Sequence, residues 1–139
     1  MSRRDYTAAE LESRLQDRGY DAEAIADALG DLRAGRFIDD RRVAAAHVRT
    51  AATIKSRGRV RIARELTARG VSRDLIEDAL SGVEPDDELA SIRRILARKR
   101  WPAKPSMAER QRMFRHLLLR GFPTDLIGKA LGRRESDED

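Results

Sequence analysis

The sequence predicts an all-α protein in which tandem three-helix repeats form an elongated, curved array of about eight helices, with a shortened third repeat. The first observation is a period of 51 residues. Gly19, Gly70 and Gly121 share one frame, with Leu four residues before, Arg one before, Ile six after and Leu ten after. A period of this size is typical of helical arrays, in which a single unit cannot bury its apolar face alone. Composition agrees, because 38% charged and 4% aromatic residues suit amphipathic helices better than sheets.

The first unit is expected to span residues 1–54. Gly19 is a left-handed stop that only glycine adopts at low cost. Asp21 is the expected N-cap of the next helix, and Asp39 with Asp40 caps a long third helix, since their side-chain oxygens bond free amides and their charges favour the positive helix end. These signals and the apolar spacing predict helices over residues 7–18, 21–34 and 39–54.

The second unit, residues 55–102, repeats the scheme, and the third, residues 103–132, has only two helices. We expect helices up to Arg69, from the N-cap Ser72 to Leu80, from Pro85 to Trp101, up to Arg120, and from Thr124 to Leu131. Residues 133–139 contain no apolar side chain that could dock, so they are predicted to form a disordered acidic tail.

The residue types argue against an enzyme and against a metal or cofactor site. The chain has no cysteine, and no glycine-rich phosphate loop or nucleophile motif occurs. His47 and His116 are far apart in sequence and fit half-buried helical positions better than metal ligands. Without an apolar run of roughly 20 residues or a signal peptide, we expect no membrane segment and a cytoplasmic location.

Charge is sorted into blocks along the chain. Residues 5–31 carry eight acidic and two basic residues, whereas residues 55–73 carry seven basic residues and one acidic residue. Residues 74–88 then hold seven acids and no base, and residues 93–120 hold ten basic residues against one glutamate. Such blocks predict separate surfaces, and a net charge of +5 favours polyanionic or acidic partners.

The basic blocks supply the candidate binding residues. On a helical wheel Arg57, Arg61 and Arg64 fall within about 60°, opposite Ile62 and Leu66. Arginine forks can grip phosphate or carboxylate at two points, although a merely solvated face is the alternative reading. The candidate residues are Arg57, Arg59, Arg61 and Arg64 as the principal ridge, with Arg41, Arg42 and Arg49 beside it; further candidates are Lys55, Arg112 and Arg115.

Three further arginines have a structural expectation. Arg18, Arg69 and Arg120 each precede a glycine stop, where a cation interacts favourably with the negative helix end and its free carbonyls. Trp101 is expected to anchor one unit against the next.

Several of these runs together resemble the RecX family of bacterial regulators of the RecA recombinase. The resemblance lies in Gly35-Arg-Phe-Ile-Asp-Asp-Arg, Arg49 in a long helix, and the run from Arg59 through Gly70 to Val71. The C-terminal Arg98-Lys-Arg-Trp and Arg120-Gly-Phe-Pro-Thr-Asp-Leu-Ile look like that family's final segment. The match covers nearly the whole chain.

This resemblance implies a negative regulator that lies in the groove of the RecA filament on single-stranded DNA, with duplex DNA as a further partner, and acts as a monomer. It would inhibit ATP hydrolysis, strand exchange and coprotease activity in DNA repair, homologous recombination and the SOS response. Two alternatives are open: a sequence-independent DNA-binding protein with helix-turn-helix-like units, and a helical-repeat adaptor for another partner.

Overall fold

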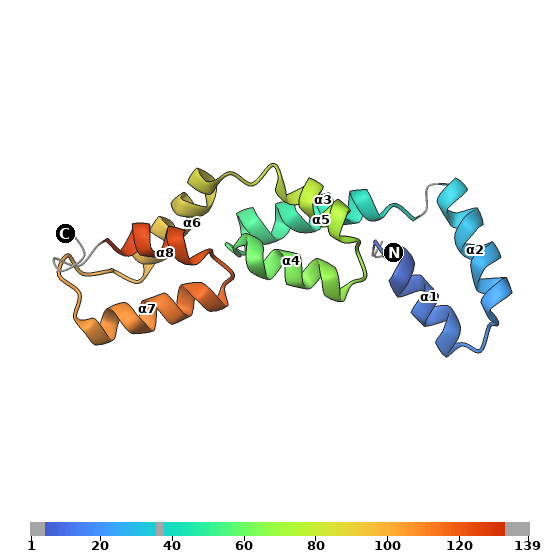
Figure 1. The fold of residues 1–139 in the computed structure, drawn as a ribbon, viewed down its shortest axis with the longest axis horizontal. Helices are drawn as coiled ribbons and strands as arrows, with labels where there is room; N and C mark the ends of the chain where they lie inside the picture. The colour runs from blue at the N-terminus through green and yellow to red at the C-terminus, as the bar shows by residue number, and fades with distance from the viewer. Residues whose placement is uncertain (1–4, 36–37, 133–139) are drawn as a thin grey trace.

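The computed structural model describes residues 5–35 and 38–132, and within them every regular element is helical (Figure 1). The all-α prediction is confirmed, and the helices follow one another along an elongated body. The predicted tail at 133–139 lies outside the described residues. The helices are α1 (Ala8–Asp17), α2 (Ala22–Ala34), α3 (Asp40–Arg49), the π-helical turn η1 (Thr50–Ile54), α4 (Arg59–Ala68), α5 (Arg73–Leu80), α6 (Pro85–Arg98), α7 (Met107–Leu119) and α8 (Thr124–Leu131).

The helix starts follow from local capping chemistry. The carboxylates of Asp21 and Asp39 and the hydroxyl of Ser72 accept hydrogen bonds from the amides three residues further on, as the sequence predicts. Pro123 holds the equivalent position before α8 without a side-chain cap. Helices α1 and α7 begin with reciprocal capping boxes, which satisfy two amides each.

Three buried clusters divide the helices into units, and the division differs from the expected one. The first cluster joins α1, α2 and Ile38, the second joins α3, η1, α4 and α5, and the third joins α6, α7 and α8. A boundary at residue 55 would separate α3 from its partners, because Ala44 and Val48 pack into the same core as Ile62 and Leu66. Among the described residues, the two-helix unit is therefore the first one.

The segment before α4 also differs from expectation. The long third helix widens into the π-helical turn η1, and Ser56 then takes a left-handed φ of 50°. Arg57 consequently lies in a non-helical link, since α4 begins only at Arg59. The helical wheel that grouped Arg57 with Arg61 was wrong in its geometry, because the link breaks the helical register.

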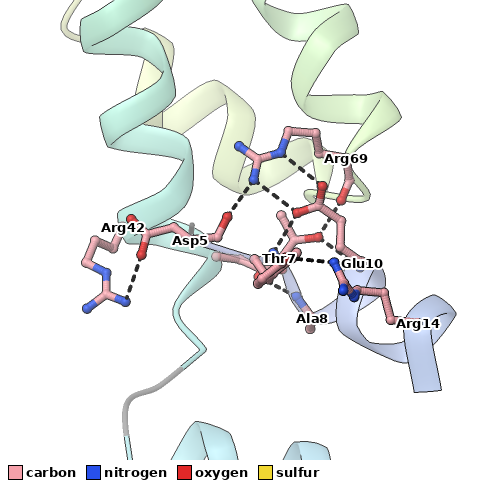
Figure 2. Close-up of polar contacts among 9 residues, drawn as sticks. Asp5, Thr7, Ala8, Glu10, Arg14, Arg42 and Arg69 are labelled. Atoms are coloured by element: carbon pink, nitrogen blue, oxygen red, sulfur yellow. Dashed lines mark hydrogen bonds and ion pairs between the residues drawn. The ribbon is translucent and has the colours of Figure 1, made fainter. Parts of the chain in front are cut away.

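Consecutive units meet at a repeated joint, in which the end of one helix touches the start of the equivalent helix of the preceding unit. At the first joint the end of α4 meets the start of α1 (Figure 2). The Thr7 hydroxyl donates to the carbonyl of Arg69 at 2.5 Å, and the Arg69 guanidinium reaches the Asp5 carbonyl at 2.7 Å and both carboxylate oxygens of Glu10 at 3.0 and 3.2 Å. Gly70 has a φ of +83°, and a Cβ there would overlap that of Ala9.

At the second joint the end of α7 meets the start of α4. The amide of Gly58 donates to the Arg120 carbonyl at 2.8 Å, and the amide of Val60 donates to the Gly121 carbonyl at 3.0 Å. The Arg120 guanidinium donates to the carbonyls of Lys55 and Ser56. Arg69 and Arg120 therefore bind carbonyls of the preceding unit, more than 60 residues away, and not those of their own helix ends.

Both joints place the same positions in the same roles. Thr7 and Gly58 are 51 residues apart, as are Asp5 and Ser56, and each pair faces the Arg-Gly end of the following unit. The period of the sequence is therefore the period of the joint. As a result α7, α4 and α1 follow one another in a row along one side of the molecule (Figure 1).

The close approach at the second joint predicts that Gly58→Ala destabilises the protein. A Cβ at Gly58 would overlap the backbone carbonyl of Gly121, and such overpacking costs about 1–3 kcal/mol. Gly128→Ala in α8 is the matched control, because its Cβ meets no atom within 4 Å, and we expect it to raise stability by about 0.5–1 kcal/mol. Urea unfolding followed by circular dichroism would measure both, and equal effects would contradict the assigned role of Gly58.

The first joint predicts a loss of stability in acid. Burial alone would raise the pKa of Glu10, but hydrogen bonds from Arg69 and Thr7 and the Arg69 charge outweigh it and lower the pKa. A carboxylate with a lowered folded-state pKa contributes stability that is complete above its usual pKa and is lost as pH falls through the lowered one. We expect Glu10→Gln to be less stable at pH 7, by about 1–2 kcal/mol, and to lose less stability below about pH 4.5. Thermal unfolding at a series of pH values would measure this, with Glu12→Gln as the control. If Glu10 has no such role, the melting temperature of Glu10→Gln would follow that of the unmodified protein in parallel at every pH.

Candidate binding surface at the second joint

Basic side chains from three helices and one link converge beside the second joint. Glu65 on α4 accepts a hydrogen bond from Arg57 Nη1 at 2.6 Å, and Arg61 Nε lies 3.5 Å from the same carboxylate oxygen. The other oxygen of Glu65 lies 3.1 Å from His47 Nε2. One carboxylate thus faces two guanidinium groups and an imidazole, so it compensates only part of the local positive charge.

The end of α7 and the last turn of α6 add to this positive charge. Burial lowers the pKa of Arg120, and the nearby charges of Arg61, Arg57 and Arg98 lower it further. Burial also lowers the pKa of His116, and the charges of Lys99 and Arg120 lower it further. We call Arg57, Arg61, Arg98 and Arg120 the second-joint cluster.

Arg59, predicted to belong to the binding ridge, has a packing role instead. Its amide and its guanidinium contact the buried carboxylate of Glu88, and Nη2 donates to the carbonyls of Leu80 and Val83 at the end of α5. Burial raises the pKa of Glu88, against the hydrogen bond and charge of Arg59. Arg59 thereby ties the start of α4 to α6 and to the end of α5.

The other predicted residues are spread over the surface. Arg64 is exposed on α4 one turn beyond Arg61, whereas Arg41 and Arg42 lie at the far end of α3 in exposed ion pairs with Asp78 and Asp5. The remaining four are Arg49 beside η1, Lys55 in the link before α4, and Arg112 and Arg115 on the exposed side of α7. Of the ten predicted residues, only Arg57 and Arg61 share the same carboxylate, that of Glu65.

A groove of about 510 Å³ runs between α3, η1 and α6 close to the cluster. Alanine and valine side chains line its floor, and Arg49, Arg57 and Arg94 lie along it. Asp87 and Glu88 also line it, so the groove combines an apolar floor with both signs of charge.

The described residues contain no group of three metal-ligating side chains, and none of their helices is long and apolar enough to cross a membrane. The guanidinium groups of the second-joint cluster are suited to binding anionic or acidic groups.

Models of three RecX domains match consecutive parts of the chain. They are the first three-helix domain over residues 1–32, the second over residues 39–80 and the third over residues 86–131. The chain is also 36% identical to "Regulatory protein RecX" of Chromobacterium violaceum over 99% of this chain and 88% of the relative. The chain belongs to the RecX family.

Two further RecX proteins resemble this chain in sequence or in fold. "Regulatory protein RecX" of Haemophilus influenzae (strain ATCC 51907) is 30% identical over 100% of this chain and 92% of the relative. The fold also resembles the crystal structure of RecX from Lactobacillus salivarius, with a TM-score of 0.83 at 21% identity over 92% of this chain and 84% of that one. The limits of the second RecX domain, residues 39–80, match the second buried cluster, with α3 joined to α4 and α5.

Reasoning from the sequence missed Arg98 and Arg94 on α6 and gave Arg120 only a capping role. For Arg120 the available signal was the 51-residue period, which places it where Arg69 stands and so at the end of α7 beside the start of α4. In this RecX chain the second-joint cluster therefore takes its arginines from two adjacent units.

The crowding of cations around one carboxylate predicts a two-part effect of Glu65→Gln. Removing this partly buried carboxylate should lower stability by about 1–2 kcal/mol, because Arg57, Arg61 and His47 lose their common partner. It should also raise affinity for a single-stranded oligonucleotide at low salt severalfold, since more positive charge is uncompensated. Glu77→Gln, which removes an exposed carboxylate beside Arg73, changes net charge equally and is the control for both measurements. A stronger effect of the control on either quantity would contradict the compensation described here.

Proposed function

We propose that this RecX chain is a negative regulator of the RecA recombinase that binds along the groove of the RecA filament on single-stranded DNA. Bound there, it would hinder ATP hydrolysis, strand exchange and coprotease activity, with no catalysis of its own. The observation that carries the proposal is the second-joint cluster, in a family member whose helices form an elongated row.

The mechanism follows from charge and shape. An elongated array can contact several subunits of a helical filament at once, and each contact adds to residence time. Exposed arginines near the second joint would pair with phosphate or carboxylate, while the acidic first unit would meet basic surface. Arg57 and Arg61 would exchange part of their contact with Glu65 for the partner, whereas Arg64, Arg98 and Lys99 are exposed and make no ion pair with described residues.

The test uses those exposed residues, because reversing them should leave the fold intact. Arg64→Glu, Arg98→Glu and Lys99→Glu together should raise the concentration that half-inhibits RecA ATPase on single-stranded DNA by about 10–100-fold, at about 0.5–1 kcal/mol per residue. The control triple, Arg33→Glu, Lys104→Glu and Lys129→Glu, makes the same change in charge at exposed sites elsewhere. Undiminished inhibition by the first triple, with unchanged circular dichroism, would remove Arg98 and the exposed cations beside the second-joint cluster, Arg64 and Lys99, from the mechanism.

A protein that binds DNA directly is the second candidate, supported by the three-helix domains and the uncompensated arginines. Its affinity would fall with salt by a log–log slope of about −0.7 per phosphate on single strands, with no added binding to RecA. Measuring binding to DNA alone and to the RecA filament at the same salt would separate the two functions. A helical-repeat adaptor for another partner is favoured only if neither binds.

A further inference from the structure

The end of α1 has the features of a joint but no neighbouring unit among the described residues. Arg18-Gly19 is the third copy of Arg69-Gly70 and Arg120-Gly121, and Gly19 takes the same left-handed φ of +88°. A Cβ on Gly19 would meet nothing within 4 Å, whereas those on Gly70 and Gly121 would overlap the preceding unit. Tyr20 is 56% exposed, but the equivalent Phe122 is 1% exposed. This end therefore keeps the local structure of a joint, and no described residue of this chain occupies its other half.

The start of α7 has the features of that other half. Ser106-Met-Ala-Glu repeats the pattern of Thr7-Ala-Ala-Glu, and both segments form capping boxes. In the first joint, the first and fourth residues of this pattern make the contacts: the Thr7 hydroxyl donates to the carbonyl of Arg69, and the Glu10 carboxylate binds the Arg69 guanidinium. Ser106 and Ala108 are exposed, and α7 starts three residues earlier than the 51-residue period would place it, so its first turn projects further.

Position and charge suit contact between two copies. The end of α1 and the start of α7 lie at opposite ends of the row formed by α7, α4 and α1 (Figure 1), so one copy could follow the next without closing on itself. The ends also differ in charge, because residues 5–31 are acidic and residues 93–120 are strongly basic. Opposite charges at the two ends favour head-to-tail over head-to-head contact.

We infer that copies of this chain bind one another head to tail, the end of α1 of one copy receiving the start of α7 of the next. Arg18 would pair with Glu109, the hydroxyl of Ser106 would donate to the Arg18 carbonyl, and Gly19 would admit Ala108. Tyr20 would be covered on the same contact. The contact reproduces the first joint between molecules.

One such joint is small, so the association is weak in dilute solution, with a dissociation constant on the order of 0.1–1 mM. Its consequence grows where copies are held side by side, because a shared support raises the effective concentration to the millimolar range. If the proposed function holds, that support is the filament, and binding along it is cooperative. The self-association itself needs no recombinase, so it is tested apart from the proposed function.

Sedimentation velocity of the full chain from about 10 µM to 1 mM, at about 0.15 M salt, tests the inference. The weight-average sedimentation coefficient should rise continuously with concentration, and Arg18→Glu should weaken this rise at least tenfold, whereas Arg33→Glu, an equal change on α2, should not. An equimolar mixture of Arg18→Glu and Glu109→Arg chains should associate although neither does so alone, because every contact between unlike copies again joins opposite charges. A constant coefficient up to 1 mM, or a mixture that stays dissociated while both variants retain their helical content, would overturn the inference.

Disulfide trapping gives an independent readout in a chain that has no cysteine of its own. Asp17 and Ala108 correspond to Ala68 and Ala9, which line one shallow pocket at the first joint. Oxidising a mixture of Asp17→Cys and Ala108→Cys chains should give the mixed dimer at least tenfold faster than Asp17→Cys with Lys129→Cys. If the two mixtures form mixed dimers at equal rates, a second copy does not occupy the end of α1.

Discussion

The architecture depends on one contact, the meeting of a helix end with the start of the equivalent helix in the preceding unit. A helix end leaves carbonyls without partners, and a helix start leaves amides without partners. In this protein the free carbonyls of one helix end pair with the free amides of another helix start: the Arg120 and Gly121 carbonyls accept hydrogen bonds from the amides of Gly58 and Val60. The guanidinium of the same arginine then binds carbonyls on the far side, so the joint leaves few unsatisfied polar groups.

This contact also explains why the recurrent residue is glycine. The left-handed turn at each repeated glycine needs φ above zero, and at two of the three an atom of another unit, the Cβ of Ala9 or of Arg61, lies where a side chain would begin. The joint holds together separate cores and not one continuous core, since the three buried clusters belong to three different units. Stability is then a sum of local cores and of the joints between them.

Much of this could be predicted from local signals. The caps at Asp21, Asp39 and Ser72 and the stops at the repeated glycines were correct, because a cap or a left-handed turn is decided within a few residues. The grouping of helices was wrong because a period defines the length of a repeat and not where the unit begins. Only packing shows that α3 belongs with α4 and α5.

The binding residues illustrate the same limit. Arg57 and Arg61 share the carboxylate of Glu65, but not through a common helical face, because Arg57 lies in the link that precedes α4. The roles of Arg59 and Arg120 depend on partners 29 and 64 residues away, and no pattern within one helix reports such distances. Long-range contacts of this kind require the arrangement of the units in space.

The separation of charge along the row has a further physical consequence. A body with an acidic first unit and a strongly basic third unit carries a permanent electric dipole along its long axis. Near any polyanion the molecule therefore experiences a torque that turns its C-terminal units forward before contact is made. Encounters would begin from a preferred orientation, so the direction in which the chain lies on an extended anionic partner is selected during approach and not by trial of both arrangements afterwards.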